Sequence, residues 1–302
     1  MNITRIPATP DPATAAAEVA AALQGIASLD LSLPPGADGA GELPELDAPG
    51  VWVAAAGASL ANGVIVYAHG GSFVSRMPEL IARYAHRLSA ATARPVFVSH
   101  YRLAPADPYP APLDDVVRAY EQLLTAGVPA SSIALLGESS GGALVLSALL
   151  RLKETGRDLP ATALTISPLT DFTLAAPSID EAREPGVDRA LLTRITEAYL
   201  AGAPRDEPPQ SPYHGDLGAL PPLLMLVGGA EAFLDDTLRF ARAASAAGTK
   251  VEVDLHESLT HAFQITALTP QSPTGERLLA RMAGWIDERL GDGASRARPA
   301  GA

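Results

Sequence analysis

Short apolar runs alternate with amphipathic stretches along most of the 302-residue chain. The apolar runs predict buried strands, which we place at 51–55, 64–68, 95–99, 133–136, 163–166, 223–227 and 251–255. Apolar residues at helical spacing predict helices at 79–91, 113–124, 141–153, 234–247 and 278–290. This alternation predicts an α/β fold in which a mostly parallel sheet has helices on both faces. Ligands of such sheets bind at the carboxyl ends of the strands, so we expect functional residues in the loops that follow them.

Two segments depart from this alternation. At the N-terminus, Asp11 and Pro12 open a predicted Ala-rich helix to about Ala27, and a Pro- and Gly-rich loop follows at 34–50. Later, one predicted helix (191–201) lies among Pro-rich and charged connections, which indicates an insertion over the strand ends. We therefore divide the chain into an N-terminal cap helix and linker (1–50), a main α/β domain (51–290) with a cap insertion at about 172–212, and a tail (291–302) that we expect to be disordered.

Composition narrows the range of functions. The chain has 22 Lys and Arg against 34 Asp and Glu, and because nucleic-acid binding needs clustered basic side chains, we expect no nucleic-acid partner. It has no cysteine, which excludes disulfides, thiolate metal sites and a cysteine nucleophile. The N-terminus does not resemble a signal peptide, and no apolar run reaches the roughly 20 residues of a membrane span. We expect a cytoplasmic protein with no membrane partner.

The motif Gly137-Glu-Ser-Ser-Gly-Gly142 follows one predicted strand and begins a predicted helix. This is the context of the nucleophile elbow G-x-S-x-G, a sharp turn that exposes the hydroxyl of its serine, here Ser139. The next amide, that of Ser140, would lie at a helix N-terminus, where free N–H groups favour an anion. A phosphate-binding loop or a plain turn is the alternative, but the flanking strand and helix favour a catalytic serine.

A second glycine motif, His69-Gly70-Gly71-Ser72-Phe73, directly follows the predicted strand 64–68. Acyl transfer builds negative charge on a carbonyl oxygen, and preorganised backbone N–H groups stabilise that charge. Glycines allow the backbone to approach a substrate closely. A tight turn with a structural histidine would read the same way, and the order of this motif relative to the elbow favours an oxyanion hole.

A serine nucleophile needs a histidine base, and the base should lie in a loop at the carboxyl end of a strand. His261 follows the predicted strand 251–255 and a short loop. His256 is a weaker candidate because it stands at the end of that strand, too early to reach over the sheet. We predict His261 as the base.

The acid that orients the base should follow the strand 223–227. Glu231 lies in the loop after that strand and is our first candidate. Asp235 is the second, since it falls where the next helix starts, where carboxylates often only complement the helix dipole. The predicted triad is therefore Ser139, Glu231 and His261, in the chain order typical of α/β-hydrolases.

The sequence resembles the bacterial hormone-sensitive-lipase-like (family IV) carboxylesterases of the α/β-hydrolase superfamily over about residues 50 to 290. Besides the two glycine motifs, the matching blocks are Tyr101-Arg-Leu-Ala-Pro105, Pro112-Leu-Asp-Asp115, Ser167-Pro-Leu-Thr-Asp171, Leu220-Pro-Pro222 and His261-Ala-Phe263. The resemblance implies an α/β-hydrolase fold with a helical cap. It also implies an oxyanion hole built from the amides of Gly71, Ser72 and Ser140, with Gly70 keeping the loop open.

The chain also departs from the usual pattern of that family. The family usually has Gly where Ser72 stands, Ala where Ser140 stands, and Asp where Glu138 stands. Its acid block usually reads Asp-Pro-Leu-Arg-Asp, and this chain has Glu231-Ala-Phe-Leu-Asp235 there, a register that again selects Glu231. Because the oxyanion hole uses backbone amides, it can survive the two serines.

Together these features predict a serine carboxylesterase that hydrolyses small-molecule esters with short- to medium-chain acyl groups through an acyl-enzyme. Such chemistry needs no metal and no organic cofactor. The resemblance also suggests a homodimer formed through an edge strand or the last helix. The alternative is a non-hydrolytic use of the fold, as a small-molecule binder or a lyase or dehydratase, although such roles lose the triad Ser or His, and both are present here.

Overall fold

The computed structural model describes residues 1–8, 11–38, 43–182, 184, 186–269 and 272–291. Within these residues, eight strands form one sheet in the order β1-β8-β7-β6-β5-β3-β4-β2. The strands are β1 (Asn2–Ile6), β2 (Gly50–Val53), β3 (Val64–Ala68), β4 (Val96–Ser99), β5 (Ile133–Glu138), β6 (Thr162–Ile166), β7 (Leu223–Gly228) and β8 (Val251–His256). Neighbouring strands run parallel except β2, which pairs antiparallel with β4. The prediction of a mostly parallel sheet is confirmed.

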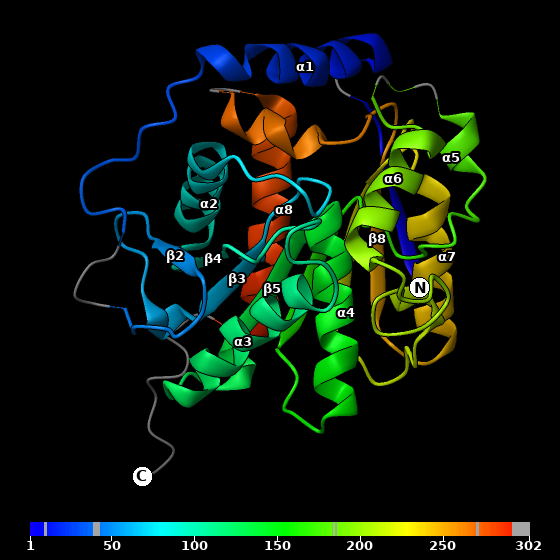
Figure 1. Cartoon of the computed structure of the whole chain (residues 1–302). Helices are drawn as coiled ribbons and strands as arrows, with labels where there is room; N and C mark the ends of the chain where they lie inside the picture. Colours follow the sequence, from blue (N-terminus) through cyan, green and yellow to red (C-terminus); the bar gives the residue numbers. More distant parts are fainter. Residues whose placement is uncertain (9–10, 39–42, 183, 185, 270–271, 292–302) are drawn as a thin grey trace.

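Helices cover both faces of the sheet (Figure 1). The first face carries α3 (Ala111–Thr125), α4 (Ser140–Glu154) and α7 (Leu234–Ala246), and the second carries α2 (Pro78–Thr92) and α8 (Pro273–Leu290). Successive side chains of a strand point to opposite faces. Val64 and Val66 of β3 accordingly enter the first apolar core, whereas Ile65 and Tyr67 enter the second. Burial on both faces explains why these strands read as continuous apolar runs.

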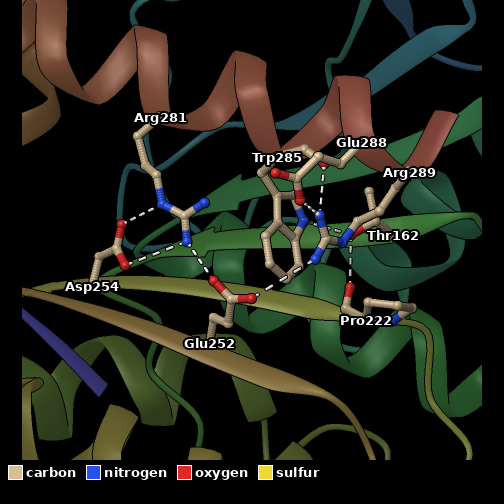
Figure 2. A network of polar contacts seen from close by, with 8 residues as sticks. All are labelled: Thr162, Pro222, Glu252, Asp254, Arg281, Trp285, Glu288 and Arg289. Atoms are coloured by element: carbon tan, nitrogen blue, oxygen red, sulfur yellow. Dashed lines mark hydrogen bonds and ion pairs between the residues drawn. The ribbon is translucent and has the colours of Figure 1, made fainter. Parts of the chain in front are cut away.

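A polar network binds α8 to the sheet (Figure 2). Arg281 forms ion pairs with Glu252 and Asp254 of β8, each at 2.7 Å. Trp285 donates a hydrogen bond from its indole N–H to the hydroxyl of Thr162 on β6, at 2.7 Å. The short helix η5 (Phe263–Leu268) lies between β8 and α8 in the chain and contacts α8. The network therefore fixes α8, which η5 contacts, against β6 and β8.

The N-terminal segment differs from the prediction. The sequence predicts only a cap helix and linker for residues 1–50, whereas Asn2–Ile6 forms β1, the edge strand that pairs with β8. The strand is short and four of its five residues are exposed, so no buried apolar pattern announces it. The predicted helix is present as α1 (Pro12–Gly25), where the Asp11 side chain caps two backbone amides. This helix contacts η5, just after His261.

The predicted insertion at 172–212 contains α5 (Ser178–Glu181) and α6 (Arg189–Leu200), the latter close to the predicted helix at 191–201. The helix α5 contacts α7. No helix in the described part of the chain is both long and apolar enough to pass through a membrane. The predicted tail, apart from Gly291, lies outside the described residues.

Candidate active site

Ser139 occupies the sharp turn between β5 and α4. Its backbone has φ 51° and ψ −120°, a region that costs energy for a residue with a side chain. The glycines on either side make the turn possible: a Cβ at Gly137 would lie 2.2 Å from the carbonyl oxygen of Gly141, and one at Gly141 would lie 2.0 Å from that of Ala68. The strained turn therefore presents the Ser139 hydroxyl at the carboxyl end of the central strand.

The structure brings His261 to this hydroxyl. His261 lies in the loop between β8 and η5, and its Nε2 is 3.0 Å from Ser139 Oγ. Burial lowers the pKa of His261 to about 4, so the ring is neutral at pH 7. When Ser139 donates to Nε2, the ring proton sits on Nδ1. His256 is buried against the ring of Phe263 and makes no hydrogen bond to Ser139.

Glu231 lies in the loop between β7 and α7 with 1% of its surface exposed. One carboxylate oxygen, Oε2, accepts hydrogen bonds from the Gly228 amide at 3.0 Å and the Ser167 hydroxyl at 2.8 Å. Burial raises the pKa of Glu231 well above its ordinary value, and the negative charge of Glu184 raises it further. The other oxygen, Oε1, is buried without a hydrogen-bond partner among the described residues, and the same is true of His261 Nδ1. These two atoms are a complementary acceptor and donor, although no hydrogen bond joins them in this structure.

Asp235, the second candidate for the acid, is engaged elsewhere. It lies in the first turn of α7, and its Oδ2 accepts a hydrogen bond from the Ser178 amide at 3.0 Å. The Asp235 amide in turn donates to the Ser178 hydroxyl at 2.9 Å. The side chain therefore fastens the insertion to α7.

The glycine motif after β3 forms a tight loop beside Ser139. Gly71 has φ 127°, and a Cβ there would lie 2.2 Å from the carbonyl oxygen of Ser75. The amides of Gly71 and Ser72 have no hydrogen-bond partner among the described residues, and that of Ser140 is the first of α4. The Gly70 amide, by contrast, donates to Glu138 Oε1 at 3.2 Å. Gly70 thus shapes the loop but is not a free donor for an oxyanion.

Glu138 is a site residue whose role the sequence did not indicate. Its Oε1 accepts from the Tyr67 hydroxyl at 2.8 Å as well as from Gly70, and its Oε2 accepts from the Gln264 side-chain amide. Burial raises its pKa in spite of these bonds. Because Gln264 follows His261 closely, one carboxyl group links β3, the glycine loop and the base loop. Its place directly before Ser139 was the only signal in the sequence.

His69 is structural in this geometry. Its Nε2 accepts a hydrogen bond from Arg76 Nε at 3.1 Å, so Nδ1 carries the proton and donates to the Gly70 carbonyl oxygen at 2.6 Å. Its ring stacks on Tyr101 with 4.4 Å between ring centroids. Burial lowers its pKa to about 4, so it is neutral at pH 7. It holds the glycine loop in place.

A cavity of about 220 Å³ opens over Ser139 and His261. Besides Ser139 and His261, the lining residues are Gly70, Gly71, Ser72, Ser75, Arg76, Met77, Leu80, Ile81, Glu138, Ala262, Gln264 and Ile265. A smaller space of about 50 Å³ shares part of this lining and continues toward Tyr84. A larger cavity of about 390 Å³ near the end of α4 contains neither the serine nor the histidine. Within the described ranges, no cluster of three or more acidic or histidine side chains is placed to hold a metal ion.

Comparisons with known proteins identify the family of the chain. A family described as having the alpha/beta hydrolase fold matches residues 65–265. An acetyl-hydrolase of Streptomyces hygroscopicus is 36% identical over 231 residues, which cover 76% of this chain and 77% of that protein. An esterase of Acinetobacter venetianus is 31% identical and covers 75% of this chain and 76% of its own length.

Solved structures of esterases resemble the fold of this chain. The crystal structure of an esterase from the bacterial hormone-sensitive lipase family superposes with a TM-score of 0.79 at 29% identity, covering 95% of this chain and all of that one. A crystal structure of the esterase EstE5 superposes with a TM-score of 0.77 at 31% identity, covering 82% of this chain and 83% of the other.

Proposed function

The chain belongs to the hormone-sensitive-lipase-like branch of the α/β-hydrolase family and is a carboxylic ester hydrolase, and we propose that it uses a Ser139–His261–Glu231 triad. The contact of 3.0 Å between Ser139 Oγ and His261 Nε2, on a strained elbow, is the observation that supports this most directly. The neutral imidazole takes the serine proton as Oγ attacks the ester carbonyl.

The attack turns the carbonyl oxygen into an oxyanion. We propose that the amides of Gly71, Ser72 and Ser140 bind it, since the first two have no partner in the described chain and the third begins α4. The protonated His261 then gives its proton to the leaving alcohol, and an acyl group stays on Ser139. A water molecule, activated by the same histidine, hydrolyses the acyl-enzyme.

Glu231 is proposed as the acid of the triad. Its unpartnered Oε1 is the acceptor that the Nδ1–H of His261 lacks. A movement of the loop after β7 toward His261 would join the two atoms, and catalytic hydrogen bonds often tighten only with substrate bound. The carboxylate would then fix the ring tautomer and stabilise the imidazolium.

The cavity supports small substrates. About 220 Å³ lies below the usual size of ligand pockets, roughly 300 to 1,000 Å³. We propose short- to medium-chain acyl esters, from about two to eight carbons, since each methylene adds about 0.8 kcal/mol only until the pocket is full. We propose that α1, which contacts η5, and the insertion at 172–212, which bonds to the loops after β7 and β8, form the cap beside this cavity.

The test uses p-nitrophenyl esters of increasing acyl length and a fluorescent organophosphate. The wild type should hydrolyse the short esters and become labelled, whereas Ser139→Ala should lose both properties with an unchanged circular dichroism spectrum. A labelled and active Ser139→Ala variant would overturn the assignment. A folded wild type that hydrolyses no ester would favour the non-hydrolytic alternative.

A further inference from the structure

The insertion is hydrogen-bonded to the loop that carries Glu231. The Ser178 hydroxyl donates to the carbonyl oxygen of Ala232 at 2.7 Å and accepts from the Asp235 amide. Ala232 directly follows Glu231 in the chain. Hence one polar side chain of the insertion already holds the backbone at the proposed acid.

Glu184 of the insertion bonds both to this loop and to the loop that carries His261. Its Oε1 accepts a hydrogen bond from the Ala232 amide at 2.8 Å, and its Oε2 accepts one from the His261 amide at 2.6 Å. Both partners are backbone groups, so the carboxylate constrains the two loops themselves. One loop follows β7 and the other follows β8, and no other described side chain bonds to the backbone of both.

The surroundings of Glu184 make this arrangement costly. The residue is only 9% exposed, and no basic side chain in the described chain pairs with it. A buried carboxylate without a cation is unfavourable unless hydrogen bonds compensate, and the two amides supply that compensation. Packing alone does not require a buried carboxylate here, because an apolar side chain could fill the same space without the desolvation cost.

We propose that Glu184 is a positioning residue for the triad. Its carboxylate, which comes from the insertion, sets the spacing between the loop that carries Glu231 and His261. The proposal rests on the function proposed above. The distance at stake is small: a displacement of about 1 Å at reacting groups can reduce the rate about 100-fold. Losing both bonds removes the link that Glu184 makes between the amides of His261 and Ala232, and leaves the two loops joined by the hydrogen bond from the Ala230 amide to the Leu259 carbonyl oxygen.

The experiment compares Glu184→Ala and Glu184→Gln with Glu181→Gln, a control in the same insertion whose side chain is exposed and forms no hydrogen bond or ion pair with the described residues. For a short p-nitrophenyl ester, Glu184→Ala should lower kcat about 10- to 100-fold and leave KM within about threefold. Glu184→Gln should lose less, because its one amide oxygen can still accept one of the two bonds. Glu181→Gln should behave as the wild type.

The rate of organophosphate labelling is the second readout. It reports how well His261 activates Ser139, and it should fall in parallel with kcat. Melting temperatures decide whether each variant is folded, and if Glu184→Ala does not fold, Glu184→Gln alone carries the test. A folded Glu184 variant with wild-type kcat and labelling, or a change in KM only, would overturn the proposal. An inactive and unlabelled wild type would instead refute the proposed function.

Discussion

Replacing Glu231 with Gln removes a buried ionisable carboxyl and changes one of its oxygens into an NH₂ group. The amide oxygen should take the place of Oε2, because that atom accepts bonds from the Gly228 amide and the Ser167 hydroxyl. The NH₂ group then occupies the position of Oε1, the atom that the proposed triad pairs with His261 Nδ1. A donor at that place favours the tautomer with Nδ1 unprotonated and the proton on Nε2. Nε2 can then no longer accept the proton of Ser139.

The expected loss in kcat is about 10² to 10⁴, the range for an enzyme whose histidine is held in the wrong tautomer. Folding should be preserved, since the substitution keeps the volume, keeps both hydrogen bonds to Oε2 and removes a carboxyl that burial makes hard to ionise. The assay is steady-state hydrolysis of a short p-nitrophenyl ester, with circular dichroism and melting temperature measured on the same samples.

Asp235→Asn is the matched control. Its amide oxygen can still accept from the Ser178 amide, so kcat should change less than about tenfold. If Asp235→Asn is the crippled variant and Glu231→Gln keeps wild-type turnover, the acid has been assigned four residues too early. The roles of Ser139 and His261 would stand in that case, because they rest on separate segments of the chain.

Two further predictions follow from burial and from steric fit. Burial lowers the pKa of His261 to about 4, so the base stays neutral as the pH falls, and the acid limb of kcat/KM should lie below pH 6.5. An acid limb at or above pH 6.5 would show that burial does not control the protonation of this ring. Gly141→Ala places a Cβ 2.0 Å from a backbone oxygen and should unfold or inactivate the protein. Gly284→Ala, in open space on α8, should instead raise the melting temperature through helix propensity worth up to about 1 kcal/mol. Equal melting temperatures for the two variants would contradict the clash.

The elements that the sequence predicted best are those buried on both sides. Strands such as β3, β5 and β7 read as apolar runs because helices cover both faces of the sheet. The elbow was equally predictable, since the strained turn between the strand and the helix requires glycine two residues before and two residues after its serine. The position of His261 against Ser139 followed from the parallel order of the strands, which gathers their carboxyl ends at one edge.

The parts that the sequence did not reveal lack such periodicity. The strand β1 gains its stability from backbone pairing with β8, and that pairing leaves almost no trace in side-chain type. The role of Glu138 was hidden for a related reason. Its three donors come from residues 67, 70 and 264, far apart in the chain, and only the folded sheet brings them to one carboxyl.

The insertion shows the limit most clearly, because four carboxylates within nine residues have four different surroundings. Asp180 pairs with Arg189, at 2.6 and 2.7 Å. Asp188 caps α6 through the amide of residue 191. Glu181 is exposed, and among the described side chains Glu184 alone bonds to the backbone of the loops after both β7 and β8. All four are acidic side chains in the same short segment, and nothing in the sequence around them distinguishes one from another. Only the packing of the insertion against the loops after β7 and β8 decides which of them is a surface charge and which can position the proposed triad. Because Glu184 bonds to the backbone of both loops, the insertion can influence turnover through this one side chain, even though none of its described residues lines the cavity of about 220 Å³ over Ser139.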